Sequence, residues 1–491
     1  MQQLLNPFAQ KYPEAVDSTL ASQATSIKFN PSGPFAGHYL AAGGSDGLVE
    51  VWDVETRGLA RVLEGHVKSV GGLCWSRNNR YLLSASLDAT AIIWDLSVLS
   101  NPYLNPSTPI HNIASTSSSR LSTIRFDAPV ATAEFHPRNS KIILATLTCN
   151  EVVLVDLRAG GGGMTVLEDV EVGEGADMEV DGEERTKATL ACGTFSPCGS
   201  RIYAGTTGGE LLTFDPVSRL VTGRLKVATS AIRQIAFSAS GREVILSASD
   251  RALRVLAVTP STGLLTPIHR FQDLVNRTPW NAIGFSGDGE YVMGGAGHKA
   301  AHNVFIWDRD SGVLVKVLEG PKEPLIDSDW HPTKPVIASV ATSGDIHIWQ
   351  TSVPDNWAAF APGFEELEEN VEYDEREDEF DIEDETEVSR RKDAEEDLNI
   401  DITSPDNSFP RRPEPIVSLF QGTIQSNGSI GGDGGGGGIG EQEDTLEAKA
   451  VRAAQEVKDW AEREPDDDTW DRFYLSLDLL APLQEDEDDT K

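Results

Sequence analysis

Short apolar runs recur between residues 20 and 350, each followed by a turn rich in Gly, Asp or Asn and by a second run that closes on a large apolar residue. The runs are too short for helices and have the length of strands. Seven closing segments can be aligned, and consecutive ones are separated by 42, 61, 59, 41, 52 and 42 residues. They are Val51-Trp52-Asp53, Ile93-Trp94-Asp95, Leu154-Val155-Asp156, Thr213-Phe214-Asp215, Arg254-Val255-Leu256, Ile306-Trp307-Asp308 and Ile348-Trp349-Gln350.

The spacing of these repeats predicts an all-β, seven-bladed WD-repeat β-propeller over residues 1–355, because one such blade takes about 40–45 residues. The second repeat is the most complete, since Gly65-His66 opens it and Trp94-Asp95 closes it. In WD-repeat proteins a His, a Ser or Thr, an Asp and the Trp hydrogen-bond in series. By that resemblance His66, Ser84 or Ser86, Asp88 and Trp94 are structural, and a catalytic role for His66 and Asp88 is disfavoured.

The ring must close between its first and last repeats. We expect a strand near Val16–Leu20 to pair with the last repeat, and the competing closure uses Trp357–Ala361. The longer intervals predict insertions at 97–122, rich in Ser, Pro and Asn, and at 159–187, which begins with a Gly run and continues as an acidic stretch.

Three further regions follow the predicted propeller. Residues 356–404 are acidic with scattered aromatic and aliphatic residues, which predicts a disordered tail that binds partners. Residues 405–444 form a Pro/Gly-rich linker. Residues 445–482 predict short C-terminal helices, Thr445–Arg463 and Asp468–Leu480, which either dock back on the propeller or bind a partner.

The formal net charge of −37 disfavours general nucleic-acid binding and suits basic protein partners such as histones. Four cysteines without CxxC spacing predict buried free thiols in a reducing compartment. Neither a signal peptide nor a membrane span is predicted, so we expect a nuclear or cytosolic location.

No sequence motif of catalysis was found. The chain has no phosphate-binding GxxxxGK[ST] loop, no GxSxG elbow and no GxGxxG between strand and helix. His298 and His302 are four residues apart, but the Glu of a zinc protease is missing between them. We therefore expect no enzyme activity, no cofactor and no metal. A propeller hydrolase, the alternative within enzymes, would need a metal in the central channel.

Basic residues gather in the fifth and sixth repeats, near predicted turns. They offer a DNA-phosphate contact, and scattered solvated cations are the competing interpretation. The residues are Arg242, Arg251, Arg254, Arg277 and Lys299.

Three segments point to one family. They are Gln272–Trp280 with its continuation Phe285–Tyr291, the stretch Asn356–Glu385, and the N-terminal Asn6-Pro-Phe with Tyr12-Pro13-Glu14 and Leu73–Ser76. Together they resemble the retinoblastoma-binding protein 5 family in a fungal-type version. That family supplies the WD-repeat subunit of COMPASS-type histone H3 lysine-4 methyltransferase complexes. The resemblance extends from Met1 to about Ser404.

The resemblance implies a nuclear, non-catalytic scaffold that organises and stimulates a SET-domain subunit on nucleosomes. It implies three sets of contacts after the propeller. The SET-domain contact is Trp357, Phe360, Phe364 and Leu367; the contact with an Ash2-like SPRY subunit is Tyr373, Glu375, Arg376, Glu377, Phe380, Asp381 and Ile382; the contact with a second WD-repeat subunit is Leu398, Ile400 and Ile402.

A generic WD-repeat adaptor is the main alternative, for instance a ubiquitin-ligase substrate receptor or an RNA-processing scaffold. Such a protein would bind through the propeller face, and the segment Trp357–Glu385 would be dispensable.

Overall fold

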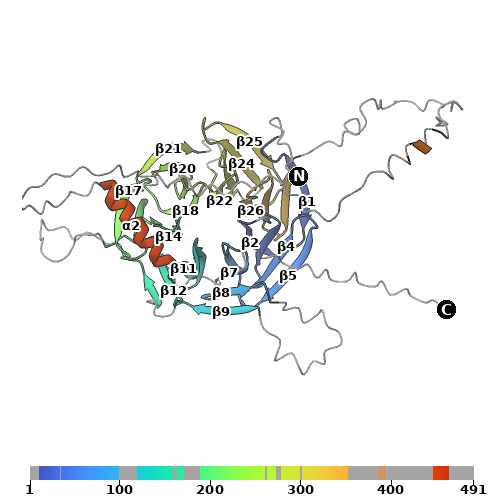
Figure 1. The fold of residues 1–491 in the computed structure, drawn as a ribbon. Coiled ribbons are helices and arrows are strands. Elements are labelled where there is room, and N and C mark those ends of the chain that lie inside the picture. The colour runs from blue at the N-terminus through green and yellow to red at the C-terminus, as the bar shows by residue number, and fades with distance from the viewer. Residues whose placement is uncertain are drawn as a thin grey trace, which may run out of the picture. The chain divides into compact units, whose positions relative to one another are not determined.

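The structure is a computed structural model. It describes residues 10–351, apart from 34, 99–118, 159–162, 171–187, 260–262, 273–277 and 299–300, together with 386, 389, 390, 392 and 446–463. Residues Glu443–Lys491 are grouped with Met1–Val353 in one compact unit, and residues Pro354–Gln442 form the second unit. Within this unit the described strands form seven antiparallel sheets of four strands each, the blades of a propeller (Figure 1).

Six blades use four consecutive strands, numbered from the innermost outwards. Blade 1 is β2 (Ala24–Phe29), β3 (Tyr39–Gly44), β4 (Leu48–Asp53) and β5 (Gly58–Glu64); blade 2 is β6 (Val70–Trp75), β7 (Tyr81–Ser86), β8 (Thr90–Asp95) and β9 (Arg120–Arg125); blade 3 is β10 (Val130–His136), β11 (Asn139–Leu147), β12 (Glu151–Asp156) and β13 (Gly163–Val166). Blade 4 is β14 (Leu190–Phe195), β15 (Ile202–Thr206), β16 (Glu210–Phe214) and β17 (Val221–Lys226); blade 5 is β18 (Ile232–Phe237), β19 (Glu243–Ala248), β20 (Leu253–Val258) and β21 (Leu265–Phe271); blade 6 is β22 (Trp280–Phe285), β23 (Tyr291–Ala296), β24 (Asn303–Asp308) and β25 (Leu314–Glu319).

Blade 7 closes the ring with a strand from the other end of the chain. It consists of β26 (Leu325–Trp330), β27 (Ile337–Ala341), β28 (Ile346–Gln350) and the N-terminal β1 (Ala15–Leu20). β1 pairs antiparallel with β28, with Leu20 opposite Ile346. The predicted closure near Val16–Leu20 is confirmed, and the competing segment Trp357–Ala361 lies outside the described residues.

The apolar runs of the sequence are explained by packing on both faces of each sheet. Ile92 and Ile93 are neighbours on β8 and are both buried. Ile92 belongs to the core shared with blade 1, and Ile93 belongs to the core shared with blade 3. Strands covered on both sides do not need polar residues at alternate positions, and hence their sequences show little alternation.

The predicted insertions were too long at both sites. β9 begins at Arg120, and β13 lies inside the range 159–187 that was expected to loop out. The strand β13 has four residues and was not predicted because it begins in a Gly run. Its Val166 pairs with Val153 of β12. Strand pairing thus imposed order on a segment whose composition favours a loop.

Helix α2 (Leu446–Ala461) confirms the first of the two predicted C-terminal helices. In Figure 1 it lies beside β11, β12, β14 and β17. The predicted second helix, Asp468–Leu480, lies outside the described residues. Within the described part of the chain, no helix combines the length and the apolar character needed to cross a membrane.

Candidate functional site

The four polar residues expected to link the second repeat form one hydrogen-bonded chain. His66 Nδ1 lies 3.1 Å from a carboxylate oxygen of Asp88, and His66 Nε2 lies 2.7 Å from Ser84 Oγ. Trp94 Nε1 donates to the same Ser84 oxygen over 2.8 Å. Because a carboxylate only accepts, His66 carries its proton on Nδ1 and accepts from Ser84 through Nε2. The structural interpretation of these residues is confirmed, with Ser84 rather than Ser86 as the hydroxyl.

Blade 7 contains a second chain of this kind, which the sequence did not reveal. Trp349 Nε1 donates to Ser339 Oγ over 2.7 Å, and His302 Nε2 lies 2.7 Å from that oxygen. The position that corresponds to His66 is taken by Pro321, since Val317–Pro321 repeats the pattern of Val62–His66. His302 comes from the loop before β24 of blade 6 instead, so it joins blades 6 and 7.

His302, one of the two histidines considered above as metal ligands, therefore has a structural role. Its side chain is buried, and burial lowers its pKa to about 4. Among the described residues, no group of three or more His, Cys, Asp or Glu is arranged to hold a metal ion.

Two neighbouring carboxylates in blade 7 also have structural partners. Asp327 accepts a hydrogen bond from the Ile27 amide over 3.0 Å, and Asp329 accepts one from the Phe29 amide over 2.8 Å. Lys28 Nζ lies 2.6 Å from Asp329. Burial raises the pKa of Asp327 to about 6. These contacts join the innermost strands of blades 7 and 1, so the carboxylates hold the ring closed.

The four cysteines are free thiols, as predicted, but only two are in buried or half-buried positions. Cys192 is buried and Cys74 is half-buried, and burial raises the pKa of each thiol to about 12. Cys149 and Cys198 are exposed because both lie in turns between strands, so the prediction of burial was wrong for these two.

Of the five basic residues proposed to contact DNA, three are described, and two of these lie far apart. Arg242 and Arg251 lie at the two ends of β19, which separates them by roughly 20 Å. Arg254 forms an ion pair with Asp250 that engages both carboxylate oxygens. Arg277 and Lys299 lie outside the described residues.

The residues expected to contact partner subunits also lie outside the described residues, and their roles stay predictions. They are Trp357, Phe360, Phe364, Leu367, Tyr373, Glu375, Arg376, Glu377, Phe380, Asp381, Ile382, Leu398, Ile400 and Ile402. Beyond these residues in the sequence, helix α2 contacts the propeller.

The last turn of α2 docks on blade 3. The Arg158 guanidinium lies 4.6 Å from the centre of the Trp460 ring and donates a hydrogen bond to the Trp460 carbonyl. Asp156 holds Arg158 in place through an ion pair of 2.6 Å, in which both side chains are buried. A cation is favourable at the carboxyl end of a helix, where unpaired carbonyls give a partial negative charge.

Further contacts surround this anchor. Asn139 Nδ2 donates to the Ala461 carbonyl over 2.9 Å, and Arg138 forms an ion pair of 3.1 Å with Glu462. The His136 ring meets the Trp460 ring edge to face at 6.1 Å. Of the two alternatives left open for this helix, docking on the propeller is the one observed.

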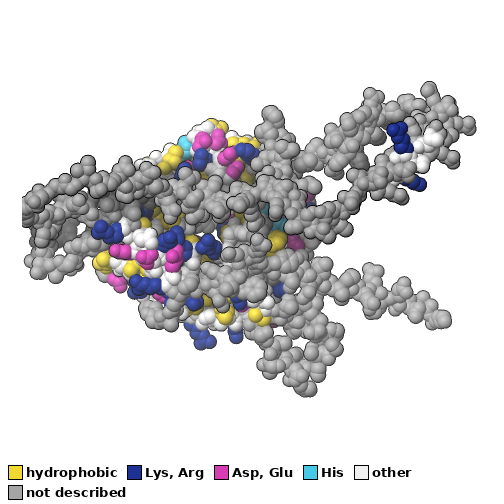
Figure 2. Space-filling model, viewed as in Figure 1, with side chains coloured by type: hydrophobic (Ala, Val, Ile, Leu, Met, Phe, Trp, Pro, Cys, Tyr) yellow, Lys and Arg dark blue, Asp and Glu magenta, His cyan; other side chains and the backbone are white. Residues whose placement is uncertain are grey.

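Between residues 455 and 459, where the side chains of α2 are described, the exposed positions are polar. Val457 and Ala461 are buried against the propeller, and Glu456, Lys458 and Asp459 are exposed. Figure 2 shows charges of both signs side by side around this part of the described surface. Ala453 and Ala454, one turn before the docked residues, are exposed.

The seven blades and the His-Ser-Trp chains define a WD-repeat β-propeller protein. In agreement, the family model described as WD domain, G-beta repeat matches residues 18–53 and 58–95. The crystal structure of the Cps50 (Swd1) β-propeller domain from Myceliophteria thermophila is similar, with a TM-score of 0.58 and 34% sequence identity. The similarity covers 68% of this chain and 99% of the Cps50 chain.

Two curated relatives identify the family. The chain is 37% identical to the Set1 complex component swd1 of Schizosaccharomyces pombe over 390 residues, which are 78% of this chain and 90% of swd1. It is 37% identical to the retinoblastoma-binding protein 5 homolog of Drosophila melanogaster over 416 residues, which are 82% of this chain and 76% of that protein. The chain belongs to the Swd1/retinoblastoma-binding protein 5 family.

Proposed function

We propose that this chain is a non-catalytic scaffold subunit of a nuclear COMPASS-type histone H3 lysine-4 methyltransferase complex. In this role it organises and stimulates a SET-domain subunit together with an Ash2-like SPRY subunit and a second WD-repeat subunit. The propeller provides the rigid platform. The segment 356–404 provides the partner contacts assigned above from the family resemblance.

The observation that supports this role most directly is the extent of the similarity to swd1. Residues 1–351 make up about 71% of the chain, whereas the similarity covers 78% of it. The shared sequence therefore continues past β28 into the acidic segment. A generic WD-repeat adaptor needs to share only the propeller.

The energetics favour several weak contacts on one segment. Burying two or three large apolar side chains contributes roughly 4–8 kcal/mol before costs. Ordering the segment costs roughly 2–5 kcal/mol. Each contact alone is thus weak, and linking them on one chain raises the local concentration of each partner. Stimulation follows if the bound segment favours the productive conformation of a mobile SET domain.

Reconstituted methyltransferase activity tests the proposal. The double substitution Phe380→Ala with Ile382→Ala is expected to lower both complex assembly and methylation rate. Leu121→Ala, which shortens an exposed apolar residue on blade 2, is the control. Unchanged assembly and rate in the double variant would show that the proposed SPRY contact is wrong.

A second variant separates this role from a generic adaptor. Deletion of residues 357–385 retains the propeller and α2, so the docked helix is not lost with the segment. The scaffold model expects the SET and SPRY subunits to be lost on pull-down. Retention of all partners by the deletion variant would favour binding through the propeller face.

A further inference from the structure

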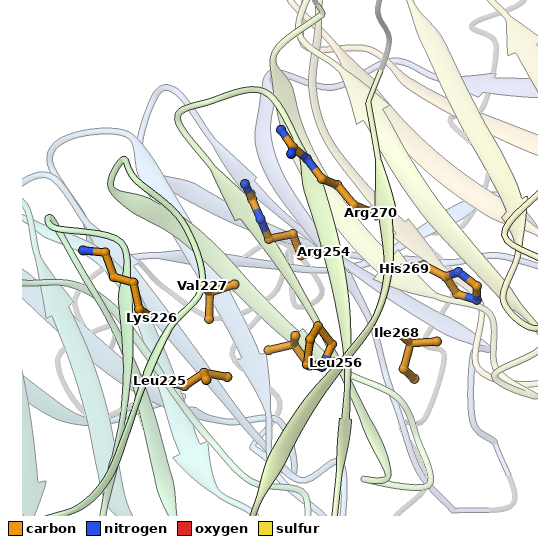
Figure 3. A pocket seen from close by; sticks show the side chains of 9 residues that line it. Leu225, Lys226, Val227, Arg254, Leu256, Ile268, His269 and Arg270 are labelled. Atoms are coloured by element: carbon orange, nitrogen blue, oxygen red, sulfur yellow. The ribbon is translucent and has the colours of Figure 1, made fainter.

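A groove lies at the edge of the propeller between blades 4 and 5 and is lined by residues of both blades. One wall is the end of β17, and the other is formed by β20 and β21 (Figure 3). Its volume is about 270 Å³. The proposed partner segment does not account for it.

The wall and floor of the groove are apolar. Leu225 and Val227 contribute from blade 4, and Leu256 contributes from blade 5. Ile268 on β21 also lines the groove and is 44% exposed. Aliphatic residues left exposed beside an apolar groove form the kind of surface that a partner covers.

Two arginines stand together at one end of this groove. Arg254 on β20 and Arg270 on β21 are directly paired in register, and Figure 3 shows their side chains extending toward the same end. Like charges directly opposite each other on neighbouring strands are destabilising. Asp250 forms an ion pair with Arg254, and its carboxylate also interacts with the charge of Arg270. The hydrogen bond of 3.2 Å from Arg270 goes to the amide oxygen of Gln272, which carries no charge.

This arrangement favours an anion beside the apolar floor. One carboxylate between two guanidinium groups leaves this end of the groove with a net positive charge, in a chain whose net charge is −37. A second carboxylate would relieve the repulsion between the two guanidinium groups, and arginine binds a carboxylate through two parallel hydrogen bonds.

The backbone of β21 adds a further means of binding. β21 is the outermost strand of blade 5, so one of its edges has no neighbouring strand in the described sheet. An extended peptide can add to such an edge through main-chain hydrogen bonds, while its side chains enter adjacent pockets.

We propose that this groove binds an extended acidic segment of a partner protein, in which a carboxylate contacts Arg270 and a neighbouring apolar side chain enters between Val227 and Ile268. This site is distinct from the segment 356–404 and does not depend on its proposed function.

Peptide selection on the full chain tests the proposal. A random peptide library displayed on phage is selected against the immobilised protein, and recovered peptides are synthesised with a fluorophore for anisotropy titration. We expect peptides that carry Asp or Glu beside Leu, Ile or Phe. Arg270→Glu is expected to weaken their binding about tenfold or more, because a charge-assisted hydrogen bond is lost. Ile268→Ser is expected to weaken it through the apolar pocket.

Arg242→Glu is the matched control, since it makes the same charge change at an exposed arginine of the same blade outside the groove. It should leave binding unchanged. A peptide in which Lys replaces the acidic residue should bind Arg270→Glu better than it binds the unaltered protein.

Three results would overturn the proposal. One is the recovery of no peptide that distinguishes the unaltered protein from Arg270→Glu. Another is recovery of groove-dependent peptides without a carboxylate. The third is displacement of the selected peptides by a synthetic peptide of residues Glu365–Glu385, which would assign the groove to this chain's own acidic segment rather than to a partner.

Discussion

Arg158 lies over the indole ring of Trp460, 302 residues further along the chain, and its guanidinium also donates to the Trp460 carbonyl. One buried side chain of the propeller thus holds both the ring and the backbone of the last helical turn. Asp156 lies two positions before Arg158 in the sequence, and its ion pair with Arg158 is formed within blade 3, without any residue of α2. The docking site is therefore part of blade 3 itself.

We predict that Trp460→Ala releases α2 and leaves the propeller folded. The substitution removes a cation–π contact of about 0.5–2 kcal/mol together with apolar burial. A helix of 16 residues is marginal on its own in water. Amide hydrogen exchange in residues 446–461 should become fast, while the strands of blades 1 to 7 keep their protection.

Glu456→Ala is the control for this prediction, because Glu456 is exposed on the same helix. Full protection of α2 in Trp460→Ala would mean that Trp460 does not anchor the helix.

We predict that His302→Ala destabilises the propeller by about 2 kcal/mol, because the buried Ser339 hydroxyl loses the imidazole that accepts its hydrogen and a cavity remains. Chemical denaturation measures the loss. His302→Gln retains a polar side chain that can reach Ser339, so it should recover part of the stability. Equal stability of His302→Ala and the unaltered protein would contradict the assigned role.

Acidification should destabilise the propeller between about pH 6.5 and pH 4. Burial lowers the pKa of His136, His302 and His331 to about 4 in each case. A lowered pKa means that the unfolded chain binds more protons in this window. The stabilisation is therefore complete above pH 6.5 and is lost as the pH falls towards 4. Each imidazole contributes roughly 2 kcal/mol of this loss by pH 5.

Denaturation at pH 7 and pH 5 checks the sign and the size of the effect. His136→Gln should reduce the difference between the two pH values, because one of the three imidazoles no longer titrates. A variant whose stability falls as much as that of the unaltered protein would exclude His136 as a contributor.

We predict that Arg251 and Arg242 differ in their effect on nucleosome binding. The two residues lie at opposite ends of β19, roughly 20 Å apart, so a contact at one end of the strand does not require a contact at the other. The backbone at Arg251 is held by a hydrogen bond of 3.0 Å from Trp280 to its carbonyl. Arg251→Glu should therefore weaken binding of the assembled complex about threefold or more and reduce its salt dependence, and Arg242→Glu should not.

Titration of nucleosomes at two salt concentrations measures both quantities. Equal behaviour of the two variants would favour the interpretation of these arginines as solvated surface charges.

The strands that end each repeat could be predicted from the sequence because their signal is local. Trp94, Trp307 and Trp349 each close a strand where the sequence placed one. The closure of the ring was predictable for a related reason, since a strand beside β28 would otherwise be missing and its edge exposed.

Contacts between distant loops could not be predicted in the same way. In the second repeat His66 follows a Gly, but Pro321 stands at the matching position after Gly320, and the partner of Ser339 is His302 from another blade. The docking of α2 depends on Arg158, which follows β12 directly before the predicted insertion 159–187. Both contacts are tertiary, and neither changes the periodicity of the sequence.

The attachment of α2 to blade 3 alters what a break in the chain would do. The polypeptide leaves the ring after β28 and is fixed to it again at Trp460. A protease that cut once between residues 354 and 442 would sever the backbone without freeing the carboxyl-terminal fragment. The two fragments of the cleaved protein would remain associated, because the carboxyl-terminal fragment stays bound to blade 3 through α2.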